Sequence, residues 1–155
     1  NVDVSVKAAE HARKVCKDMG ISYVEKRAGT QDELTKLISG IKRSEADGIL
    51  HIVNALLVAN NKLLIKKALD EKIPYIATDA EIVEEGALAN YGPNFYAIGR
   101  QSARLVHKVL MGAKPGTIPV EVPDKYDFII NLKTAKSIGI KIPDNALMMA
   151  TKVIK

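Results

Sequence analysis

The chain has 155 residues, of which 47% are hydrophobic and 26% charged, an ordinary composition for one globular domain. No apolar run approaches the ~20 residues of a membrane-spanning helix, and residues 1–4 show neither a basic start nor an apolar signal core. The net charge of +5 comes from 23 basic and 18 acidic residues without any basic block, which argues against nucleic acid as a partner.

The first part of the chain is predicted to form a helix, a strand and a second helix. Apolar residues recur at helical spacing over residues 4–19, and Gly20 follows as a C-terminal cap. Residues 21–26 alternate apolar and polar side chains, which predicts a short strand. Thr30 and Glu33 have the spacing of a capping box, so a second helix is expected to begin there.

Strands and helices continue to alternate in the next part. A nearly continuous apolar run at residues 49–53 predicts a central strand buried on both faces. Asn54 precedes a predicted helix over residues 55–69, and residues 73–78 form another apolar strand that ends at Asp79. We therefore expect an α/β fold with a doubly wound, mostly parallel sheet and right-handed crossovers.

The alternation changes after Gly86. A helix is expected over residues 96–111, and two extended pieces follow at residues 118–122 and 127–132. Two short helices, one around residues 134–138 and one after Pro143, complete the chain. A sheet of this type normally begins with a strand, whereas this chain begins at a helix, so the first strand is expected upstream.

The carboxyl ends of the strands are the expected place for a ligand, because helix N-termini present free N–H groups there. The residues that this rule selects, which we expect on one rim, are Asn1, residues 28–30, Asn54, Ala55, Thr78 and Asp79. Asn54 fits a helix cap and a ligand contact equally well, and both interpretations stay open. For Asp79 we favour contact with a ligand ammonium or hydroxyl group over a capping role.

The turn around Gly92 and Pro93 contains further polar side chains. Asn90, Tyr91 and Asn94 can line a pocket, but Asn and Pro are also ordinary turn formers. We interpret them as turn residues.

No catalytic or metal-binding pattern is visible. His11, His51 and His107 are far apart and match no metal motif, and the single Cys16 forms neither an internal disulfide nor a Cys-based metal cluster. Nucleophile-elbow, phosphate-loop and dinucleotide motifs are absent. We therefore expect no catalytic residues, no metal site and no cofactor.

Motifs in the second half of the chain occur in a specific order. They read Ile-Pro-Tyr-Ile-Ala-Thr-Asp at residues 73–79, Val-Glu-Glu-Gly-Ala-Leu-Ala-Asn-Tyr-Gly at 83–92 and Gly-Arg-Gln-Ser-Ala at 99–103. The tail adds Leu-Met-Gly-Ala-Lys-Pro at residues 110–115, Ile-Pro-Val-Glu at 118–121, Ile-Asn-Leu-Lys-Thr-Ala-Lys at 130–136 and Gly-Ile-Lys-Ile-Pro at 139–143. Together they resemble the ABC-transporter substrate-binding proteins that include tryptophan and tyrosine binders.

The resemblance implies a type I periplasmic-binding-protein fold, in which two doubly wound lobes hold a ligand in the cleft between them. Residues 1–112 are then the second lobe, and residues 113–155 are a crossover and C-terminal segment that returns toward the first lobe. The positions of Asn54 and Asp79 are typical ligand contacts in such families. Asn1 begins the first helix of the lobe, and Val2 stands where the family has Ser.

The function that the resemblance implies is solute binding. The protein would bind a small organic molecule, such as an amino acid, and deliver it to the permease subunits of an ABC importer. It would be extracytoplasmic and would reach the membrane only through the permease. The alternative is the effector-sensing domain of a transcription regulator with the same lobe fold, which a DNA-binding segment upstream would distinguish.

Overall fold

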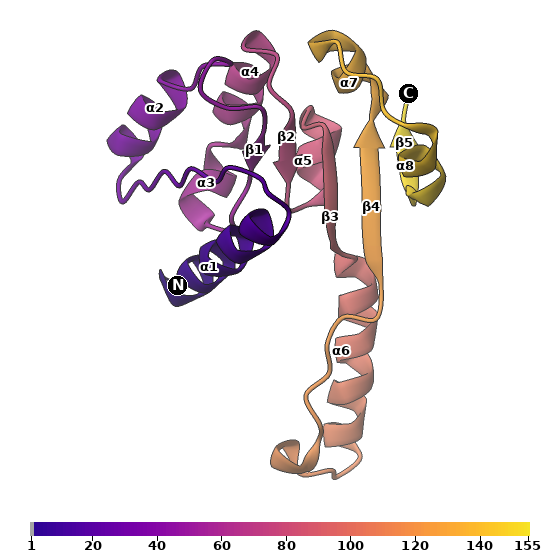
Figure 1. Ribbon diagram of the computed structural model, residues 1–155. Helices are drawn as coiled ribbons and strands as arrows, with labels where there is room; N and C mark the ends of the chain where they lie inside the picture. The colour runs from indigo at the N-terminus through magenta and orange to yellow at the C-terminus, as the bar shows by residue number, and fades with distance from the viewer. Residues whose placement is uncertain (1) are drawn as a thin grey trace.

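A five-stranded sheet with the strand order β1-β2-β3-β4-β5 organises the computed structural model, which describes residues 2–155 (Figure 1). The pairs β1–β2, β2–β3 and β4–β5 are parallel, and β3–β4 is antiparallel. The predicted α/β class with a mostly parallel sheet is confirmed. The strands are β1 (Ile49–Leu50), β2 (Tyr75–Ala77), β3 (Ala89–Pro93), β4 (Tyr126–Asn131) and β5 (Lys152–Ile154).

Helices cover both faces of the sheet. One apolar core joins the sheet to α2, α4 and α5, and a second joins it to α7 and α8. No helix between residues 2 and 155 has the length and apolar character that a membrane span requires. The helices are α1 (Val2–Asp18), α2 (Gln31–Ser39), α3 (Ala55–Ala59), α4 (Asn61–Asp70), α5 (Ala80–Glu85), α6 (Phe95–Leu110), η1 (Pro115–Thr117), α7 (Leu132–Ile138) and α8 (Asp144–Met149).

The helix ends follow the sequence signals closely. Gly20 follows α1 with a φ of 69°, a left-handed conformation that glycine adopts without strain. At the start of α2, the Thr30 hydroxyl accepts from the Glu33 N–H at 3.3 Å, and the Glu33 carboxylate accepts from the Gly29 N–H at 2.7 Å. The predicted capping box is confirmed, with Gly29 in place of Thr30 as the second donor.

The helix predicted over residues 55–69 is two helices, α3 and α4, that break at Asn60. The Asn60 side-chain amide donates to the Leu56 carbonyl at 2.7 Å and exchanges hydrogen bonds with Gln31 at 2.6 and 2.9 Å. A side chain that bonds to the backbone competes with the helical hydrogen-bond ladder. The prediction of one continuous helix is therefore wrong.

Two strand predictions are also wrong. Residues 21–26 belong to no strand, and β1 lies at the sheet edge with Leu50 51% exposed, not in the centre. Both errors have one physical cause, because a strand needs a paired neighbour and none lies beyond β1 among residues 2–155. Residues 118–122 likewise join no strand, whereas the extended piece predicted at residues 127–132 corresponds to β4.

Residues 94–125, which we call the arm, extend away from the sheet (Figure 1). The arm contains α6, η1 and the chain that returns to β4. Its two ends meet, since the Asn94 N–H donates to the Lys125 carbonyl at 2.9 Å and Pro93 pairs with Tyr126. Strands from both sides of Gly112 share the one sheet, and the predicted domain boundary at that residue stays a prediction.

Strand β3 passes very close to the end of β2 at Gly92. A Cβ atom at Gly92 would lie 2.4 Å from the backbone oxygen of Thr78, so only glycine fits without a backbone shift. This close approach fixes the position of Thr78, which immediately precedes Asp79.

We expect Gly92→Ala to lower the free energy of unfolding by about 1–3 kcal/mol, because the added methyl group overpacks against backbone. Gly48→Ala is the matched control, since its Cβ would meet only the Pro74 oxygen at an ordinary 3.8 Å. The control should change stability by no more than about 0.5 kcal/mol. Denaturant melts measure both, and equal effects would contradict the tight approach of β3 to Thr78.

Candidate functional site

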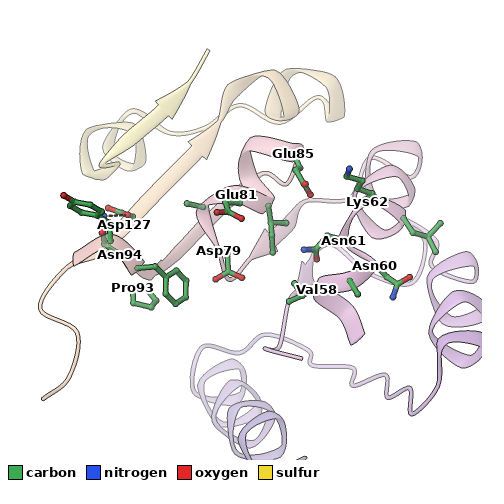
Figure 2. A pocket seen from close by; sticks show the side chains of 16 residues that line it. Val58, Asn60, Asn61, Lys62, Asp79, Glu81, Glu85, Pro93, Asn94 and Asp127 are labelled. Carbon is green, nitrogen blue, oxygen red and sulfur yellow. Dashed lines mark hydrogen bonds between the residues drawn. The ribbon is translucent and has the colours of Figure 1, made fainter. Parts of the chain in front are cut away.

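A cavity of about 870 Å³ opens beyond the carboxyl ends of β2 and β3. Its wall comes from residues 58–63 at the break between α3 and α4, residues 79–82 and 85 at α5, residues 93–96 at the base of the arm, and Asp127 on β4. Figure 2 shows Asp79 between Asn61 and Val58 on one side and Pro93, Asn94 and Asp127 on the other.

Asp79 occupies the N-cap position of α5 but does not cap it. Its backbone is extended, with φ −122° and ψ 148°, and its side chain accepts no hydrogen bond from the first turn of α5. The Thr78 hydroxyl donates to the Asp79 carboxylate at 2.9 Å and holds it at the cavity wall. The capping interpretation is thus wrong for Asp79, and the contact with ligand stays a prediction. Thr78 acts here as the residue that orients Asp79.

Asn54 caps α3. Its side-chain oxygen accepts from the backbone N–H groups of Leu56 at 2.9 Å and Leu57 at 3.4 Å. The capping interpretation is confirmed, and the side-chain nitrogen stays available to a ligand. Asn54 and Ala55 are exposed and are not part of the cavity wall, although Asn54 and Asp79 follow parallel strands and lie at the same end of the sheet. Asn1 lies outside the described residues.

Asn94 has a local structural role and also lines the cavity, so the interpretation of this residue as a turn former alone is wrong. Its side-chain oxygen accepts from the Ala97 N–H at 2.8 Å, which caps α6, and its side-chain nitrogen donates to Asp127 at 2.8 Å. It also lines the cavity. Of its neighbours, Asn90 is buried, and Tyr91 is exposed and stacks on Tyr126 with ring centroids 5.7 Å apart.

Several residues of the cavity wall were missed in the sequence. Asn60, Asn61 and Lys62 lie at the break between α3 and α4, and two consecutive Asn residues inside a helical pattern were the available signal. Phe95, Tyr96 and Asp127 come together only because both ends of the arm meet, which no local pattern predicts.

A buried chain of polar side chains lies behind the cavity. The His51 Nδ1 atom and the Tyr75 hydroxyl are 2.8 Å apart, and that hydroxyl donates to the Asn61 side-chain oxygen at 3.4 Å. Burial lowers the pKa of His51, and the nearby Asp79 charge opposes this more weakly. Burial also raises the pKa of Tyr75, and Asp79 adds to that rise. Both side chains are therefore neutral near pH 7. The Tyr75 hydroxyl holds the Asn61 side chain in place from the buried side of the cavity wall.

No group of three His, Cys, Asp or Glu side chains in the described chain could hold a metal ion. The cavity offers carboxylates, amides and aromatic rings instead. Such a wall can bind an organic molecule through hydrogen bonds and apolar contact.

Comparisons with known proteins point to one family. The family model described as ABC transporter substrate binding protein matches residues 1–154. The chain is also similar to the tyrosine-binding protein of Clostridioides difficile (strain R20291), with 32% identity over 118 residues. That match covers 76% of this chain and 34% of the relative, so the chain spans about a third of that protein's length.

Two solved structures are similar over almost the whole chain. A conserved domain protein from Vibrio cholerae O1 biovar eltor has a TM-score of 0.87 at 29% identity, covering 96% of this chain and 50% of that one. An ABC domain from Streptococcus pneumonia, solved in complex with L-Trp, has a TM-score of 0.86 at 24% identity and covers 97% and 52%. The chain spans about half of each.

We expect the free energy of unfolding to fall as the pH is lowered from about 7 to about 5. The pKa of His51 is lower in the folded chain than the ordinary 6.5, so the unfolded chain takes up the proton first. The stabilising contribution is therefore complete above the unfolded pKa and is lost as the pH falls through the folded pKa. His51→Gln should flatten this part of the profile in denaturant melts.

The carboxyl groups with lowered pKa values affect the free energy of unfolding only at lower pH. Ion-pair or hydrogen-bond partners lower the pKa of Glu25, Glu71 and Glu121 below 4.5, so their contributions are lost only below that value. A slope between about pH 7 and 5 that persists in His51→Gln would contradict the assignment to His51.

Proposed function

Since the chain belongs to the family of ABC transporter substrate binding proteins, we propose that it is part of a solute-binding protein that carries a small organic ligand, such as an amino acid, to an importer's permease. The similar Clostridioides difficile protein is a tyrosine-binding protein, which supports this class of ligand. We further propose an extracytoplasmic location, as is typical for this family.

Asp79 carries the proposal. Its carboxylate stands at the carboxyl end of β2, has no capping function, is oriented by Thr78 and faces the cavity (Figure 2). A fixed carboxylate in this position accepts hydrogen bonds from an ammonium or hydroxyl group without having to reorganise first. Ligands of open parallel sheets bind at this end of the strands. Asn54 lies at the same end of the sheet, and its side-chain nitrogen takes no part in the cap.

We infer that the arm belongs to the other lobe of the two-lobed protein, which completes the cleft. No residue of α6 is buried in this chain, and an apolar groove of about 420 Å³ runs between α6 and residues 115–120. An exposed apolar groove of this kind is typical of a surface that another domain covers. The lobe division that we propose therefore runs after Pro93 and before Tyr126, where the two ends of the arm meet, and not after Gly112.

Closure of two lobes couples ligand binding to a change in the shape of the protein. A ligand that contacts both lobes binds the closed state better than the open state and shifts the population toward closure. The permease can then distinguish loaded from empty protein by shape. This mechanism uses no cofactor and no covalent step.

In the full-length protein, we expect Asp79→Asn to weaken binding of L-tyrosine by about 1–3 kcal/mol, which is about tenfold to a hundredfold, because a buried charge-assisted hydrogen bond is lost. Its thermal stability should change little, since Asp79 caps no helix. Asn54→Ala should instead lose about 0.5–2 kcal/mol of folding free energy with the cap.

Calorimetric titration and thermal melts separate these outcomes. Asp70→Asn, an exposed change at the end of α4, is the control for the charge change. Unchanged affinity in Asp79→Asn would remove Asp79 from the site. Failure of the full-length protein to bind any amino acid would remove that ligand class.

The arm yields a separate expectation. Val120 is 97% exposed in this chain, yet Val120→Asp should destabilise the full-length protein by about 1–3 kcal/mol, because the other lobe buries the new charge. Lys114→Asp, an exposed arm residue outside the groove, should change stability by about 0.5 kcal/mol or less. Equal, small effects in denaturant melts would show that the arm is free in solution.

A further inference from the structure

The cavity wall carries a strong excess of negative charge in a basic protein. Four carboxylates and one ammonium group line it within the described residues, whereas the whole chain has a net charge of +5. The excess is therefore local and runs against the overall composition. The charged side chains are Asp79, Glu81, Glu85 and Asp127, with Lys62 as the cation.

None of these four carboxylates takes part in an ion pair within residues 2–155. The ion pairs of the described chain use other acidic residues. One of them is Glu84, which lies on α5 between Glu81 and Glu85 and pairs with Lys152 at 2.5 Å. Asp79 and Asp127 are held by neutral donors, the Thr78 hydroxyl and the Asn94 amide. Neither carboxylate forms an ion pair with a cationic side chain among residues 2–155. Closing a cleft over uncompensated carboxylates is costly unless the ligand brings the opposite charge.

Asn61 is a second, independent feature of the wall. The residue is only 6% exposed, and its side-chain oxygen is occupied by the Tyr75 hydroxyl. Its side-chain nitrogen forms no hydrogen bond to any part of the chain that the structure describes, and the side chain lies in the cavity wall beside Asp79 (Figure 2). Since this nitrogen is not among the buried atoms that lack a partner, it reaches the cavity surface, where a carbonyl oxygen of the ligand can accept from it.

Phe95 and Tyr96 supply the apolar part of the wall. Both rings are largely exposed at the base of the arm and line the cavity. The faces of aromatic rings attract cations and also stack against flat apolar groups. A positively charged organic group therefore finds favourable contacts on the aromatic side as well as on the acidic side.

We propose that the cavity selects a net-cationic organic amine that also carries a carbonyl acceptor and a flat apolar group, in preference to a zwitterion. The inference rests on the proposed function of the same site and narrows its ligand class. The ammonium group contacts the acidic part of the wall, and the carbonyl oxygen accepts from Asn61.

Three probes with the same benzyl side chain and different net charge test this in the full-length protein. Calorimetric titrations compare L-phenylalaninamide, a cation, with L-phenylalanine, a zwitterion, and N-acetyl-L-phenylalanine, an anion. We expect the affinities to fall in that order, by about three- to tenfold at each step. Added salt should weaken binding of the amide most, because screening acts on the uncompensated charge.

Two variants place the effect in the cavity. The double change Glu81→Gln and Glu85→Gln removes two wall carboxylates and should abolish most of the preference for the amide. Glu84→Gln on the same helix removes one carboxylate outside the cavity and should leave the preference intact.

The outcomes distinguish the inference from the proposed function. Equal or tighter binding of L-phenylalanine, or a preference unchanged in the double variant, would overturn the charge selection and leave solute binding standing. Binding of none of the three probes would also overturn the inference, and the L-tyrosine titration would then decide the proposed function separately.

Discussion

The parallel pairing of β1, β2 and β3 is the constraint from which the candidate site follows. Parallel strands end on the same side of the sheet, so the starts of α3, α5 and α6 converge there. Gly92 lets β3 approach the Thr78 carbonyl, and Thr78 in turn orients the Asp79 carboxylate. The strand order therefore places the Asp79 carboxylate in the cavity wall, and the absence of a side chain at Gly92 allows the close packing that holds it there.

The cavity and the base of the arm share side chains. Asn94 caps α6 and bonds to Asp127, and both residues line the cavity. On the opposite face of the same strands, Tyr91 stacks on Tyr126 and joins the two chain segments that lead to the arm. A ligand that contacts Asp127 would thus contact the hydrogen-bond partner of Asn94, the first residue of the arm. In the two-lobed account, this connection links occupancy of the cavity to closure.

Local sequence patterns predicted most helices, the capping box at Thr30 and the end of the sheet where Asp79 lies. They failed where a strand depends on its neighbours, because the alternation in residues 21–26 specifies a face but supplies no pairing partner. They also missed the helix break at Asn60, whose side chain bonds to the Leu56 carbonyl and to Gln31, which lies 29 positions away in the sequence. The family resemblance supplied the binding class, while the acidic excess of the wall became visible only when Glu81, Glu85 and Asp127 were brought together in space.

Hydrogen–deuterium exchange of the full-length protein, with and without a saturating amino-acid ligand, tests the central claim most directly. If the cavity forms the site and closure involves the arm, ligand should slow exchange at two separate places, the start of α5 at residues 79–82 and the base of the arm at residues 94–97. Protection confined to other parts of the chain, or protection at α5 without any change at the base of the arm, would contradict the account.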